Sequence, residues 1–192
     1  MKKNIIRKVN FVAGMAVVFV FAITISSCGN MGSNKMTTVE ISNKAIGDST
    51  NFSGDKDITM IGKKLFSCFK GEHNQKYLQK LFPDSAAVAM MYSLAKTKPK
   101  TANEIDSVIV EANKVLSGNF KDAQQGGLME NVVWENAELD KMMTQATEEK
   151  TPPGRFLFLY GHSGEVKFKI SAKCMVLDDV WFIAQDIKFR KY

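Results

Sequence analysis

The side chains best suited to acid–base or metal chemistry are two histidines, His73 and His162. Imidazole titrates near neutral pH and is a common metal ligand. His162 lies in a Gly-His-Ser-Gly turn with no second His, Cys or Asp at metal-ligand spacing, and His73 follows Glu72 at a predicted helix start. We therefore predict that both histidines are surface residues and that the chain holds no metal ion. No glycine-rich nucleotide loop and no Gly-x-Ser-x-Gly elbow occurs, so we predict no cofactor.

A third reactive side chain, Cys28, follows a segment typical of secretory signals. Four basic residues in the first eight precede fifteen uncharged residues, 11–25, which are short for a membrane span of about 20 apolar residues. The motif Ile25-Ser26-Ser27-Cys28 then resembles the lipobox of bacterial lipoprotein precursors. The resemblance implies that residues 1–27 are a signal peptide, and that acyl chains on Cys28 anchor the protein in a membrane. An ordinary signal peptide with a chance cysteine is the alternative.

The residues around Cys28 also bear on location. Gly29 stands where an Asp would retain a lipoprotein at the inner membrane, so the resemblance implies delivery to the outer membrane. No acidic run like those of surface-exported lipoproteins follows, which favours the periplasmic side.

Residues 28–54 are rich in Gly, Ser, Asn and Thr and are predicted to be a flexible tether; an arm ordered on the domain is the alternative.

The remaining cysteines, Cys68 and Cys174, lie on apolar faces of predicted elements. A helix packed on a sheet could join them in a disulfide, which the periplasm permits, and two buried free thiols are the alternative. A catalytic thiol needs a nearby base and partial exposure, whereas Ala172 and Val176 flank Cys174 at two-residue spacing. We predict no catalytic residue.

The elements that position these residues are read from apolar periodicity. Apolar residues at three- and four-residue spacing predict a helix from about residue 55 to Gly71, a short helix to residue 82, and a helix capped by Thr101 that weakens at residues 117–118. Residues 86–96 are predicted to be a helix, although their alternation also fits a strand. Beyond residue 127 we predict strands, with an antiparallel meander over the last thirty-five or so residues. Residues 55–192 thus form one α+β domain.

The order of these parts resembles the nuclear-transport-factor-2-like or cystatin-like superfamily, with helices packed on a curved sheet. A helix ending in Phe-Lys-Gly-Glu, the run Leu81-Phe82-Pro83-Asp84 and a meander closing on Trp181-Phe182-Ile183 carry this resemblance. Enzymes of that superfamily keep an acid, His or Tyr in a cavity between helices and sheet. Here the helix-facing row is apolar, and the only candidates are Asp186, Tyr92 and Tyr160. Trp181, at the start of a strand, is predicted to close one end of the core.

Charge and the other side of the sheet bear on partners. The formal charge of +6 falls to +2 in residues 28–192, where 22 basic residues face 20 acidic ones, so we predict no nucleic-acid partner. Lys167, Lys169 and Lys173, with Lys188 or Arg190 on the last strand, make this side basic. Met175, Leu177 and one face of residues 156–160 make part of it apolar. If this patch is uncovered, it indicates a protein partner or a homodimer. We therefore predict a non-enzymatic binding or assembly domain; the alternative is a small cofactor-independent enzyme of the isomerase or polyketide-cyclase type.

Overall fold

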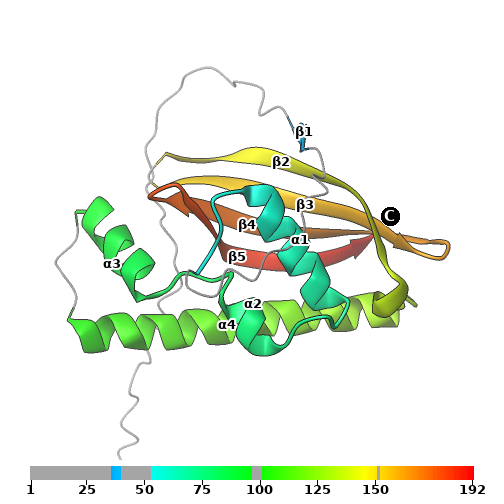
Figure 1. Ribbon diagram of the computed structural model, residues 1–192, viewed down its shortest axis with the longest axis horizontal. Helices are drawn as coiled ribbons and strands as arrows, with labels where there is room; N and C mark the ends of the chain where they lie inside the picture. The colour runs from blue at the N-terminus through cyan, green and yellow to red at the C-terminus, as the bar shows by residue number, and fades with distance from the viewer. Residues whose placement is uncertain (1–35, 40–52, 97–100, 151) are drawn as a thin grey trace, which may run out of the picture. The chain divides into compact units, whose positions relative to one another are not determined.

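The structure is a computed structural model that describes residues 36–39, 53–96, 101–150 and 152–192. The predicted signal peptide, Cys28 and most of the predicted tether lie outside these residues. Within these residues, four α-helices and a short 3-10 helix (Trp134–Asn136) precede four long strands, and a short strand comes before them all (Figure 1). The predicted α+β class is confirmed. The helices are α1 (Ile58–Phe69), α2 (Gln75–Gln79), α3 (Ser85–Leu94) and α4 (Ala102–Met129), and the strands are β1 (Thr37–Val39), β2 (Glu138–Lys150), β3 (Pro153–Ser163), β4 (Val166–Leu177) and β5 (Val180–Lys191).

The strands form one antiparallel sheet in the order β1-β2-β3-β4-β5. The short strand β1 pairs Thr37 with Thr144 and Val39 with Met142 at the edge of β2. β1 falls inside the segment predicted as a flexible tether, so part of that segment is an arm ordered on the domain. Its Thr-Thr-Val run favours extended backbone, and the edge of β2 supplies the hydrogen-bonding partners that a lone strand lacks.

Side-chain caps begin the four helices where polar residues precede apolar ones. The carboxylate of Asp57 accepts from Thr59 N at 2.8 Å to begin α1, and Asp84 accepts from Ala87 N at 2.9 Å to begin α3. Thr101 and Glu104 form a reciprocal capping box at α4. The helix predicted for residues 86–96 is confirmed, because the cap at Asp84 fixes a helical start that alternation alone leaves ambiguous.

Helix α4 is longer than predicted, since it continues through residues 117–118 and 126–127 to Met129. Gly127 lies directly under the Trp134 ring, which an added Cβ would overlap, so this glycine allows close packing rather than ending the helix. The helix ends two residues later, where Asn131 takes a left-handed φ of 64° and Val132 N donates to Gly127 O.

The core lies between the helices and one face of the sheet, called the inner face below. Phe168, Ile170, Ala172 and Cys174 of β4 point into it and are buried. Aromatic rings join the layers: Phe69 of α1 lies 4.8 Å from Trp134, whose ring meets Phe168 at 5.2 Å. The row predicted to face the helices therefore packs against them.

Helix α3 covers part of the opposite face, called the outer face below. Ala87 of α3 packs with Leu177 and Phe182, and Met91 and Met175 join this smaller cluster. The apolar patch around Met175 and Leu177, which would indicate a partner if it were uncovered, is thus covered by a helix of the same chain. A covered patch offers no docking area, so any binding surface on the outer face must lie elsewhere.

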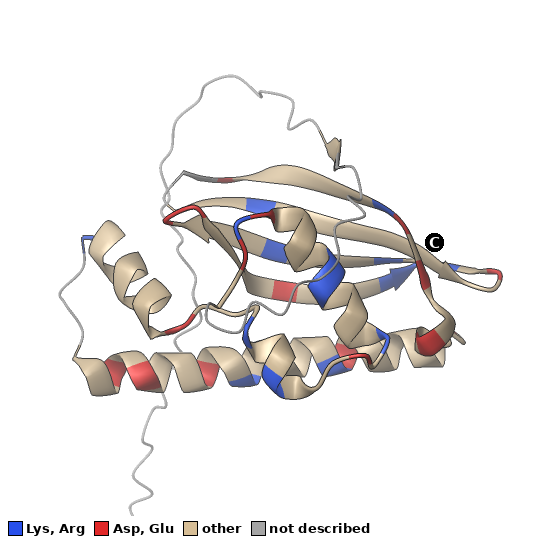
Figure 2. Ribbon diagram, in the orientation of Figure 1, with Lys and Arg blue, Asp and Glu red and all other residues tan. Residues whose placement is uncertain are grey.

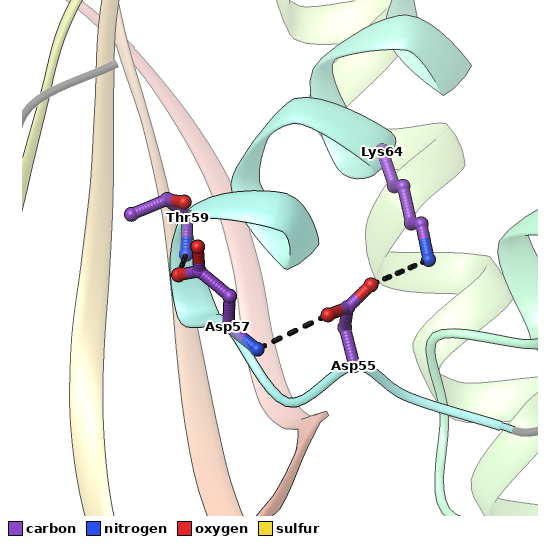
Figure 3. A network of polar contacts seen from close by, with 4 residues as sticks. All are labelled: Asp55, Asp57, Thr59 and Lys64. Atoms are coloured by element: carbon purple, nitrogen blue, oxygen red, sulfur yellow. Dashed lines mark hydrogen bonds and ion pairs between the residues drawn. The ribbon is translucent and has the colours of Figure 1, made fainter. Parts of the chain in front are cut away.

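The edge of β5 is tied to the start of α1. Asp55 and Trp181 exchange two backbone hydrogen bonds, and the half-buried Trp181 packs against the core. The side chain of Asp55 receives the buried ammonium of Lys64 at 2.7 Å and also accepts from Asp57 N (Figure 3). This network holds the first turn of α1 on the sheet.

Candidate functional site

The part of the outer face that no described helix covers combines aromatic and basic side chains. Because side chains alternate along a strand, residues next to a buried one point outward. The register places Phe156, Phe158 and Tyr160 of β3 opposite Lys173, Ser171 and Lys169 of β4. Lys188 and Arg190 of β5 lie opposite Ser171 and Lys169. The set that we call the aromatic–lysine face is Lys141, Met143, Phe156, Phe158, Tyr160, Lys167, Lys169, Ser171, Lys173, Lys188 and Arg190.

Two of the cations of this face lie against its rings. Lys141 Nζ stands 4.8 Å from the centre of the Tyr160 ring, and Lys169 Nζ stands 5.3 Å from that of Phe158. Phe156 stacks beside Phe158 with ring centres 6.2 Å apart. The three rings of β3 are half-buried, which means that each keeps part of its surface in solvent. Such a face can take up an anionic group and an apolar group at the same time.

Acidic side chains occur at the borders of the face and are already engaged. His162 Nδ1 lies 2.7 Å from Asp140, and its Nε2 lies 3.8 Å from Glu138. Lys188 pairs with Asp186 at 3.1 Å. The sequence shows no metal-ligand partner for His162 at close spacing and predicts it in a turn, whereas the structure places it near the end of β3. There a register shift between residues 139 and 141 of β2 brings Asp140 within hydrogen-bond distance. Spacing along one chain segment carries no sign of such a cross-strand pair.

Tyr192 borders the aromatic–lysine face at the end of the chain. Its ring lies 5.7 Å from that of Tyr160, and Tyr192 N donates to Lys167 O. Partial burial raises the pKa of the Tyr192 hydroxyl, and the nearby charge of Asp140 raises it further. The hydroxyl therefore stays protonated and is a hydrogen-bond donor at neutral pH.

The two cysteines of the core are free thiols in the structure. Burial raises the pKa of Cys174 to about 12, and burial together with the charge of Glu72 raises that of Cys68 to about 12. A thiol of this kind stays protonated at neutral pH and is a poor nucleophile. Neither cysteine thus has the surroundings of a catalytic one.

The three residues considered as cavity acids or bases do not meet on the inner face. Tyr160 belongs to the aromatic–lysine face, and Asp186 sits at a left-handed φ of 59° and pairs with Lys188. Tyr92 lies on α3. The structure therefore places Tyr160 on the outer face with Asp186 at its border, and neither belongs to the helix-facing row of β4.

His73 lies at a helix start as predicted, with its ring stacked 3.8 Å from that of Tyr77.

Within the described residues, no group of three or more His, Cys, Asp or Glu side chains could hold a metal ion. The described helices also include none long and apolar enough to span a membrane. No family model, no curated protein and no solved structure matches the chain.

Proposed function

We propose that the chain is a lipoprotein held in the bacterial cell envelope by acyl chains on Cys28. The basic start, the fifteen-residue apolar segment and the motif Ile25-Ser26-Ser27-Cys28 support this proposal. Several acyl chains on one residue anchor a protein durably, whereas a single chain gives only marginal binding. Gly29 favours the outer membrane, with the domain on its periplasmic side.

The domain is proposed to belong to the nuclear-transport-factor-2-like or cystatin-like superfamily. Four helices followed by an antiparallel meander, with α1 and α4 packed on one face of the sheet, support this assignment. The ordered strand β1 adds to the sheet at its β2 edge. The likeness concerns architecture, and we transfer no functional residue from it.

The domain is proposed to bind rather than to catalyse, and one observation carries this proposal. The helix-facing row of β4, where enzymes of that superfamily keep an acid or base, consists of Phe168, Ile170, Ala172 and Cys174, each at most 1% exposed. These side chains fill the space that a substrate would need, because protein interiors pack at crystal-like density. The aromatic–lysine face on the other side of the sheet instead presents basic and aromatic side chains that are at least partly in solvent.

Mass spectrometry of the protein extracted from membranes tests the anchor. We expect a chain that begins at Cys28 and carries a diacylglyceryl group and an amide-linked acyl chain. Cys28→Ser should abolish both, while Cys68→Ala, which alters a buried thiol outside the motif, should leave processing unchanged. Retention of residues 1–27 in the membrane-extracted wild-type protein would refute the proposal.

A further inference from the structure

The length of chain between the proposed anchor and the sheet limits how far the domain can move from the lipid. Strand β1 begins at Thr37, nine residues after Cys28, and nine residues reach at most about 30 Å even when fully extended. β1 pairs with β2, and β2 contributes Lys141 and Met143 to the aromatic–lysine face. This edge of the sheet is therefore held within about 30 Å of the membrane surface.

The side chains of the aromatic–lysine face are chemically complementary to a lipid headgroup layer. Its six basic side chains are Lys141, Lys167, Lys169, Lys173, Lys188 and Arg190, and half-buried rings lie between them. Aromatic side chains favour the level of the headgroups, and lysines extend their charged ends toward phosphate while their stems stay in apolar surroundings. Anionic lipid attracts such a surface within a Debye length of about 8–10 Å.

The charge of this face also argues against a second copy of the chain as its occupant. An isologous dimer would bring the same six basic side chains of two copies together, and like charges placed face to face repel. The acidic side chains at its borders, Asp140 and Asp186, are engaged by His162 and Lys188. Figure 2 shows a run of acidic residues elsewhere, on the first turns of α4, which include Glu104, Asp106 and Glu111.

From these observations we propose that the aromatic–lysine face docks on the anionic phospholipid surface of the membrane in which Cys28 anchors the chain. The inference rests on the proposed lipid anchor, because the anchor is what confines the domain near the lipid. Docking would orient the sheet against the membrane and leave α1 and α4 facing the aqueous space.

The test places a fluorescent label on either side of the domain. Ser171→Cys puts a thiol in the middle of the aromatic–lysine face, and Ser107→Cys puts one on exposed α4 as the matched control. The native Cys68 and Cys174 are buried, so labelling is selective. The lipidated full-length protein is reconstituted in vesicles of phosphatidylcholine with phosphatidylglycerol, and in vesicles of phosphatidylcholine alone.

We expect the label at residue 171 to be quenched by nitroxide lipids, and to lose iodide quenching several-fold, only in the vesicles with phosphatidylglycerol. The label at residue 107 should remain fully open to iodide in both. Lys169→Glu with Arg190→Glu, which are register partners, should restore iodide access, and Lys114→Glu with Lys121→Glu on α4 should not. These controls separate docking by the face from general charge attraction.

Two outcomes would overturn the docking proposal. Equal iodide access at residue 171 in both vesicle types would show a face that does not touch lipid. Equal shielding in both vesicle types and in detergent would show that a protein, such as a second copy, covers it. In the same samples, flotation after an alkaline wash reports whether the chain is anchored in the membrane. A chain that floats while its label at residue 171 stays accessible to iodide contradicts the docking proposal and not the proposed anchor.

Discussion

At the scale of single residues, Lys64 and Asp55 give the most direct test of what holds α1 in place. The Lys64 side chain is 9% exposed and Asp55 is its 2.7 Å partner. Asp55→Asn keeps the hydrogen-bond acceptor but leaves a buried ammonium unpaired, so we expect it to lower the free energy of unfolding by about 2–3 kcal/mol. Lys64→Met removes the charge, keeps the apolar stem and leaves the more exposed carboxylate behind, so it should cost about 1 kcal/mol or less. Urea unfolding of both variants measures this asymmetry, and equal losses would contradict it.

Also at the scale of single residues, the buried thiols are predicted to make the stability of the protein depend on pH. Burial raises the pKa of Cys174 to about 12, above the value near 9 of an exposed thiol. Below pH 9 neither state ionises, whereas above it the unfolded chain loses the proton and the folded chain keeps it. Stability should therefore fall as pH rises from 9 to 12, by up to about 1.4 kcal/mol per pH unit for this thiol.

Cys174→Ala is the variant that isolates this effect, because it removes the titrating group from both states. Its free energy of unfolding should decline less steeply with pH above 9 than that of the wild type. Parallel curves for the two proteins in that range would show that Cys174 does not contribute. Alkylation should agree, with Cys68 and Cys174 unreactive in the folded protein and reactive in denaturant.

At the scale of elements, two glycines of α4 are predicted to respond in opposite ways to one added methyl group. Gly118 has nothing within 4 Å of the position of a Cβ, so Gly118→Ala should stabilise the helix by about 0.5–1 kcal/mol. Gly127 faces the Trp134 ring, whose Nε1 is fixed by a 2.9 Å bond to Gln124 O, so Gly127→Ala should cost about 1–3 kcal/mol. Thermal unfolding of the two variants compares them directly. A stabilised Gly127→Ala would mean that the ring can move.

The same helix shows what could be predicted from the sequence. Its start at Thr101 follows from local chemistry, since the Thr101 and Glu104 capping box lies within four residues. Its end does not, because Gly127 and Trp134 meet only in the folded chain. The pairing of β1 with β2 is missed for the same reason. Local caps and periodicity predict the helices and the inner row, while contacts between distant segments require the register.

The candidate site could likewise be predicted from the sequence only in part. Alternation along β4 predicts that the lysines point away from the core, and the register confirms it. The sequence likewise places one face of residues 156–160 on this side of the sheet, and Phe158 and Tyr160 lie there beside Lys169 and Lys141. What alternation cannot predict is that α3 covers Met175 and Leu177, because that contact depends on how α3 packs in the folded chain.

At the scale of the whole molecule, the two faces of the sheet have different surroundings. The inner face is buried under α1 and α4, whereas the outer face keeps half-buried rings and charged lysines in solvent. A short link from Cys28 to β1 would set the distance between this second face and the membrane. In the proposed docking, the fold, the link and the surface charge would act together, since each would affect how often the face meets lipid.

Docking of the face is predicted to depend on the length of this link. Eight residues, 29–36, separate Cys28 from β1, and a twenty-residue Gly/Ser insertion after Gly32 would lengthen the link to 28 residues. The effective concentration of a tethered group falls roughly as the −3/2 power of link length, so the docked-to-undocked ratio should drop about sixfold. Iodide quenching of the label at residue 171 in phosphatidylglycerol vesicles measures it. The same insertion at the exposed hairpin turn after Gly164 should leave the ratio unchanged, and an unchanged ratio for the lengthened link would mean that the anchor does not govern docking.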